Sequence, residues 1–146
     1  MDYKAVADIA WQVFELAPSV PGRRSDPKLV FLRDFPHGSC DSLAYATAAI
    51  LYENGLGDWW VVTQSDGESS HVWLEWRAED GSPLFSIDTT AHQFLEVQDP
   101  FVGPGPTPTA NRFSEPRTAT RFSQLPHHWA RDAELALLAH VKNATS

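Results

Sequence analysis

The single cysteine of the chain, Cys40, stands where a helix is expected to begin. A thiolate is a far better nucleophile than a thiol, and free cysteine ionises only near pH ~8.5. The N–H groups and the dipole at a helix N-terminus favour the anion, so this position predicts a lowered thiol pKa. The N–H of Cys40 is also expected to act as one donor of an oxyanion hole. Cys40 is therefore a candidate nucleophile; the alternative is a small buried apolar residue.

His71 opens a segment of alternating apolar and polar residues, directly after the polar stretch 65–70. At the start of a strand it is expected at the rim of a sheet. There an imidazole can take a proton from a thiol and return it to a leaving amine. The chain has six histidines, and an exposed, inert side chain is the alternative for this one. The position of His71 relative to an acid separates it from the other five.

That acid is Asp88. An Asp-Gly pair at 80–81 predicts a hairpin turn. A hairpin centred there pairs Trp73 with Asp88 and His71 with Thr90, which puts Asp88 on the face of His71 as a diagonal neighbour, ~7–8 Å away between Cα atoms. A carboxylate at that place accepts the second N–H of the imidazole and fixes its tautomer. A one-residue shift in the pairing register moves Asp88 to the other face of the sheet. The alternative for Asp88 is a turn residue that ends the strand.

Three further residues are candidates for contacting substrate: Trp73, His37 and Gln93. His37 precedes the cysteine by three positions, and Gln93 follows the acid by five. The alternatives are a loop histidine for His37 and a core aromatic ring for Trp73. The pair at 127–128 is His-His, but no cysteine or acid has ligand spacing to it, so neither a metal nor another cofactor is expected.

The segments that position these residues indicate an α+β fold. Apolar residues at three- and four-residue steps predict a helix from Asp2 to Pro18 and another from Cys40 to Asn54-Gly55. Strands are expected at 59–64, 71–77 and 84–88, with Val72, Leu74 and Trp76 on one face of the second. A last helix is expected at 128–142. The stretch 98–121 holds five of the eleven prolines; we expect it to be irregular, as a cover over a cleft or as an ordered surface wrap.

Whole-chain properties narrow the class of protein. A length of 146 residues predicts one domain, and a net charge of −8 argues against nucleic acid or an anionic membrane as partner. One cysteine allows no internal disulfide. The N-terminus lacks a signal-peptide pattern, and no apolar run reaches the ~20 residues of a membrane span. We therefore expect a cytoplasmic protein, or one exported without a classical signal peptide.

Three short segments together resemble the transglutaminase-like and papain-like superfamily of cysteine hydrolases: Phe35–Cys40, His71–Glu75 and Ile87–Ala91. The resemblance covers residues 35–94. It implies a nucleophile helix packed on an antiparallel sheet, a catalytic triad of Cys40, His71 and Asp88, and acyl transfer through a thioester. Peptidase, amidase, deamidase and transglutaminase activities all fit this chemistry, so the resemblance also implies a protein or peptide as substrate.

One departure from the family pattern concerns the second oxyanion donor. Papain-like enzymes place a glutamine before the cysteine, but Gln12, the only glutamine there, lies inside a predicted helix. The second donor is therefore unassigned. The alternatives to an enzyme are a catalytically silent peptide-binding module on the same fold and a structural domain with a buried Cys40.

Overall fold

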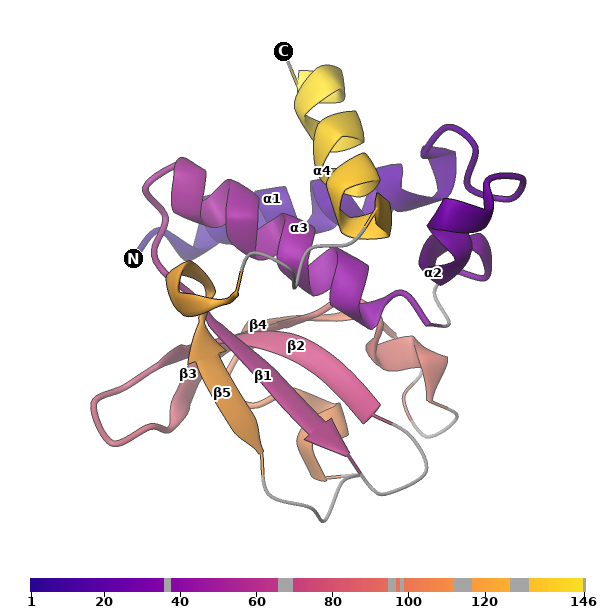
Figure 1. The fold of residues 1–146 in the computed structure, drawn as a ribbon. Helices are drawn as coiled ribbons and strands as arrows, with labels where there is room; N and C mark the ends of the chain where they lie inside the picture. The colour runs from indigo at the N-terminus through magenta and orange to yellow at the C-terminus, as the bar shows by residue number, and fades with distance from the viewer. Residues whose placement is uncertain are drawn as a thin grey trace.

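The computed structural model describes residues 1–35, 38–65, 70–94, 97, 99–111, 117–126 and 132–145. Three long helices lie on one face of a five-stranded sheet (Figure 1). The α+β class and the helix packed on an antiparallel sheet are confirmed. None of the described helices is long and apolar enough to span a bilayer.

Helix α1 (Tyr3–Leu16) begins and ends as the sequence predicts. The Asp2 side chain caps it by accepting a hydrogen bond from the N–H of Ala5 at 3.1 Å, which satisfies one of the unpaired donors at a helix start. Its buried face consists of Val6, Ala10 and Val13. A short helix, α2 (Val30–Arg33), follows in the loop region.

Helix α3 (Cys40–Glu53) occupies the range expected for the nucleophile helix. It stops at Asn54, and Gly55 follows with φ +70°, a left-handed conformation that glycine adopts without steric cost. Helix α4 (Asp132–Thr145) closes the fold against α3 and α1. Its expected start at residue 128 lies outside the described residues, and it continues three residues beyond the expected end at Lys142.

The three central strands of the sheet agree with the sequence within one residue: β1 (Trp60–Ser65), β2 (Ser70–Arg77) and β3 (Pro83–Asp88). All neighbouring pairs are antiparallel, in the order β4-β3-β2-β1-β5. The β2–β3 hairpin has the predicted register, with Leu74 opposite Ile87. It departs only beside the turn, where a bulge pairs Arg77 with Pro83 instead of Leu84.

The expectation of an irregular stretch at 98–121 is wrong at both of its ends. Strand β4 (Phe101–Pro104) pairs with β3, and strand β5 (Thr118–Arg121) pairs with β1. The segment therefore supplies both edge strands of the sheet. Between them, the one-turn helix η4 (Pro108–Asn111) brings Ala110 into a buried cluster with Val62 and Trp73.

The two faces of the sheet have different neighbours. Val72, Leu74 and Ile87 face the helices and pack in one cluster with Ala44 and Ala48 of α3. The alternate residues point away from the helices, toward the 107–111 segment. This alternation decides on which side of the sheet each candidate site residue lies.

Candidate active site

Cys40 is the first residue of α3, as the sequence predicts. Ser39 occupies the N-cap position, but its side chain makes no capping bond to α3. Its hydroxyl donates instead to the carbonyl of Phe31 at 2.8 Å. That bond ties the start of α3 to α2 and leaves the first N–H groups of the helix without a side-chain cap.

The surroundings of the Cys40 sulfur oppose ionisation. Burial raises the pKa of the thiol to about 12, and the Asp41 carboxylate, with Oδ1 3.6 Å from Sγ, adds to this. The N–H of Val72 also contacts the sulfur and acts in the opposite direction. The expectation of a lowered thiol pKa is therefore wrong, because loss of water around the sulfur outweighs the favourable helix terminus.

His71 and Asp88 are joined directly. Nε2 of His71 lies 2.7 Å from Oδ1 of Asp88, and both side chains are completely buried. Asp88 is the residue after Ile87, so the observed register puts it on the same face of the sheet as His71. The predicted contact between the imidazole and its carboxylate is present.

The second oxygen of Asp88 is held by two hydroxyl groups. Thr107 Oγ1 and Thr109 Oγ1 each donate to Oδ2 at 2.6 Å. Both threonines are buried and lie at the start of η4. Sequence reasoning missed them, because two threonines around a proline resemble any surface loop and nothing local relates them to an aspartate 19 and 21 positions earlier.

Gln93 contacts the other nitrogen of the imidazole. Its Nε2 lies 2.9 Å from Nδ1 of His71. Because an amide nitrogen only donates, Nδ1 is the acceptor, and Nε2 carries the proton that His71 donates to Asp88. Gln93 was a candidate for contacting substrate; in the structure its contact is with the candidate base, whose ring also meets the edge of Phe94 at 4.9 Å.

Trp73 does not offer a surface to a substrate. Its ring is 1% exposed, lies 5.7 Å from the His71 ring between centroids, and donates from Nε1 to Glu75 Oε2 at 2.8 Å. The expected role as a substrate contact therefore does not fit this structure. The remaining candidate, His37, lies outside the described residues.

The sheet separates the sulfur from the imidazole in this structure. Cys40 packs against the helix-facing cluster that contains Val72, whereas His71 and Asp88 point to the opposite face with Trp73. The two faces of the sheet come closest beyond the Leu74–Ile87 pair, where the pairing between β2 and β3 ends. There the sulfur reaches the N–H of Val72, the residue next to His71.

A small cavity marks this point of the molecule. Cys40, Val72 and Asp88 are among the residues that line it, and its volume is about 10 Å³. A cavity of that size holds one water molecule at most. The cavity therefore has no room for a peptide in this structure.

Two further observations concern metal binding and similarity to known proteins. Within the described ranges, no group of three or more His, Cys, Asp or Glu side chains could hold a metal ion. Comparison with family models, curated proteins and solved structures finds no match to this chain.

Proposed function

We propose that the protein is a thiol-dependent acyl-transfer enzyme with Cys40 as nucleophile, His71 as base and Asp88 as orienting acid. The observation that carries the proposal is the buried hydrogen bond between His71 and Asp88. A buried carboxylate beside an imidazole fixes the tautomer and stabilises the imidazolium that forms during catalysis. The resemblance of residues 35–94 to the transglutaminase-like and papain-like superfamily supports the same assignment.

The tautomer supports His71 as a base acting through Nδ1. Nε2 carries a proton toward Asp88, so the lone pair that can take a proton from a thiol is on Nδ1. Gln93 donates to that lone pair in the resting protein, and it has to move away before Nδ1 can take a proton from the thiol. Because its hydrogen bond fixes the resting tautomer of His71, Gln93 is a positioning residue in the proposed mechanism.

Cys40 reacts as a neutral thiol that loses its proton during the attack. With a pKa of about 12, the sulfur is protonated at neutral pH. The S–H proton passes to Nδ1 of His71 while the sulfur bonds to the amide carbon and the carbonyl oxygen becomes an oxyanion. The N–H of Cys40 stabilises that oxyanion. The C–N bond then breaks, His71 returns the proton to the leaving amine, and a thioester remains on Cys40.

Water or a second amine completes the reaction by displacing the thioester. Peptide hydrolysis, deamidation and transamidation differ in the leaving amine and in this last acceptor. The substrate is accordingly a protein or peptide that carries a reactive amide. The sulfur and imidazole have to come together where β3 leaves β2, so substrate binding is coupled to an opening of this region.

The test is to trap the thioester or a stable analogue of it. Intact-mass spectrometry after incubation with a peptide vinyl sulfone should show one adduct, which peptide mapping assigns to Cys40. We expect His71→Ala and Asp88→Asn to slow adduct formation at least tenfold, and His140→Ala, the same kind of change on α4, to leave the rate unchanged. Equal rates in His71→Ala and in the unmodified chain contradict the triad.

A catalytically silent peptide-binding module is the second candidate. The raised pKa of Cys40 favours it, because a structural thiol needs no ionisation. This function predicts that Cys40→Ala binds peptide as well as the unmodified chain and that no adduct forms under native conditions. A purely structural domain predicts neither binding nor labelling until the protein unfolds.

A further inference from the structure

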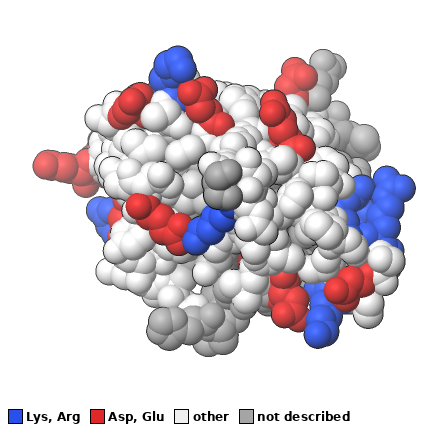
Figure 2. All heavy atoms as spheres, turned by 90° about the horizontal axis from the view of Figure 1, so that it is seen from above, with Lys and Arg blue, Asp and Glu red and all other residues white. Residues whose placement is uncertain are grey.

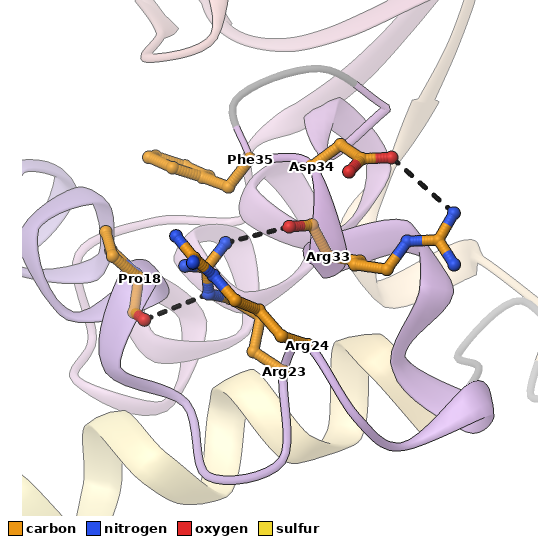
Figure 3. Close-up of a pocket in the computed structure, with 6 residues that line it drawn as sticks. All are labelled: Pro18, Arg23, Arg24, Arg33, Asp34 and Phe35. Carbon is orange, nitrogen blue, oxygen red and sulfur yellow. Dashed lines mark hydrogen bonds and ion pairs between the residues drawn. The ribbon is translucent and has the colours of Figure 1, made fainter.

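A basic depression lies at the end of α1, beside α2 (Figure 3). Its volume is about 740 Å³, and its lining consists of Pro18, Arg23, Arg24, Arg33, Asp34 and Phe35. Three cations against one carboxylate give it a net positive charge on a chain whose formal charge is −8. Figure 2 shows Lys and Arg side chains at the edge of the molecule on the α2 side, with Asp and Glu side chains beside them. Such a concentration favours an anionic ligand.

Arg23 is held rigidly by the backbone around it. Its Nε donates to the carbonyl of Pro18 at 2.9 Å, and its Nη1 donates to the carbonyls of Leu32 and Arg33 at 3.2 and 3.0 Å. Nη2 has no acceptor among the described residues, so its two N–H groups can bind a ligand. A guanidinium fixed in this way loses little conformational entropy when it binds a carboxylate.

Arg24 supplies the unpaired charge. It is exposed, and no acceptor within the described part of the chain binds its guanidinium. Arg33 is different, because its Nη2 lies 3.6 Å from Oδ2 of Asp34, the one acid of the depression. Among the described residues, no carboxylate forms an ion pair with Arg23 or Arg24.

The depression is close to the candidate nucleophile along the chain. Phe35, on its rim, precedes Cys40 by five residues, and five residues span at most roughly 18 Å. An extended peptide with its reacting carbonyl at Cys40 therefore reaches the Phe35 rim of the depression within about five residues. Phe35 is held against Phe14 of α1, with 5.5 Å between ring centroids, and offers an apolar wall for an aliphatic stem.

We propose that this depression binds an acidic side chain of the peptide substrate, a glutamate or aspartate within about five residues of the reacting amide, with Arg23 and Arg24 as its ligands. The choice of substrate rests on the proposed function. The volume exceeds what a single inorganic oxyanion fills, and the apolar wall suits a residue with a carbon stem. Bidentate recognition of a carboxylate is what paired guanidinium groups provide.

The test is a direct binding measurement that does not need catalysis. Fluorescence anisotropy compares two labelled peptides that differ only in glutamates replaced by glutamines, with the full chain and its Cys40→Ala variant. We expect the glutamate peptide to bind at least threefold more tightly to both proteins, and Arg24→Glu to abolish the difference. Lys28→Glu makes the same charge change in the same loop but outside the depression, and we expect less than a twofold effect from it.

Two results overturn the proposal. One is equal binding of the two peptides; the other is an equal loss of binding in Arg24→Glu and Lys28→Glu, which indicates general charge attraction only. Inorganic phosphate tests the source of the anion: binding of phosphate without discrimination between the peptides also overturns the peptide assignment. Failure of Cys40 to form an adduct bears on the proposed function alone, because the binding measurement proceeds without the thiol.

Discussion

His71 and Asp88 form a hydrogen bond of 2.7 Å that no solvent reaches. Burial of an acid beside an imidazole is costly unless every polar atom of the pair is satisfied. Here Gln93 bonds the second ring nitrogen, and Thr107 and Thr109 bond the second carboxylate oxygen. These five side chains therefore form one connected hydrogen-bonded group.

The first prediction concerns the charge of Asp88. Asp88→Asn keeps the size of the side chain but removes the carboxylate that accepts from His71 Nε2. If the proposed mechanism holds, the rate of substrate turnover falls on the order of 10²–10⁴-fold, because the imidazole loses both its tautomer and the stabilisation of its cation. The measurement is a single-turnover rate of amide cleavage, with circular dichroism to establish that the variant is folded. Full activity in a folded Asp88→Asn protein contradicts the assignment.

The second prediction concerns the ionisation of Cys40. The thiol pKa of about 12 predicts slow alkylation by iodoacetamide at pH 8 in the native protein and fast alkylation in the unfolded chain. Asp41→Asn removes the nearby negative charge and should lower the pKa, but not below the ordinary value, because burial is the larger cause. Asp8→Asn, an exposed change on α1, is the matched control. A native labelling midpoint below pH 8.5 is the outcome that contradicts the described electrostatics.

The same thiol predicts a direction for stability at high pH. A pKa raised in the folded state means that the thiol stabilises the fold fully below its unfolded pKa, near 8.5–9, and that this contribution is lost as pH rises toward 12. The free energy of unfolding should therefore fall more steeply between pH 9 and 12 in the unmodified chain than in Cys40→Ala. Urea titrations at several pH values measure both slopes. Parallel slopes contradict the raised pKa.

The third prediction concerns Gln93 and the tautomer of His71. In the unmodified chain, long-range ¹H–¹⁵N spectra should show Nε2 protonated and Nδ1 unprotonated, because the Gln93 amide donates to Nδ1. Gln93→Glu replaces that donor by a carboxylate that accepts, so Nδ1 should become a donor and carry a proton. Gln93→Met, which neither donates nor accepts strongly, should leave Nδ1 unprotonated. A spectrum unchanged in Gln93→Glu means that Gln93 does not contact the ring in solution.

The fourth prediction concerns the two threonines on Asp88. Thr107→Val and Thr109→Val each remove a donor to a buried carboxylate, and each should lower the free energy of unfolding by about 1.5–3 kcal/mol. Their effects should not add in the double variant, because both hydroxyls bond the same oxygen. Thr63→Val, at an exposed position of β1, should change stability by less than about 0.5 kcal/mol. If Thr107→Val and Thr109→Val also lower the free energy of unfolding by less than about 0.5 kcal/mol, the hydrogen bonds to Asp88 are contradicted.

The hairpin that joins His71 and Asp88 could be predicted from the sequence because its determinants are local. The Asp-Gly turn sets the register, and Gly81 has the positive φ of +86° that such a turn requires. Alternation along β2 then determines which side chains share a face. The bulge at Arg77 leaves this relationship intact, since it lies next to the turn and not next to the site.

The relation of Cys40 to the hairpin could not be predicted in the same way. Alternation separates Val72 from His71 but does not say which of the two faces the helix covers. Which face the helix covers depends on how the buried side chains of the whole domain pack. In this structure the helix covers the face of Val72, so the Cys40 sulfur lies on that side. Burial also decides the thiol pKa, and the position of Cys40 at a helix start carries no information about it.

The edge strands were missed for a different reason. Four-residue strands such as Phe101–Pro104 and Thr118–Arg121 show too little alternation to separate them from the proline-rich stretch around them. They form because neighbours far away in the chain offer unpaired backbone groups. Tertiary contacts of that kind leave no local pattern.

The pairing of β5 with β1 has a consequence for the order of folding. Thr118 lies opposite Thr63, so closing this pair joins residues 55 positions apart, at an entropic cost of about 3.5 kcal/mol. Until residues 118–121 have been synthesised, the open side of β1 presents unpaired N–H and C=O groups on a strand that is apolar at Val61 and Val62. A nascent chain in that condition is a template for pairing with another chain. Strand β5 therefore replaces the six-residue edge of β1 by a four-residue edge, and short edge strands offer less to a pairing chain.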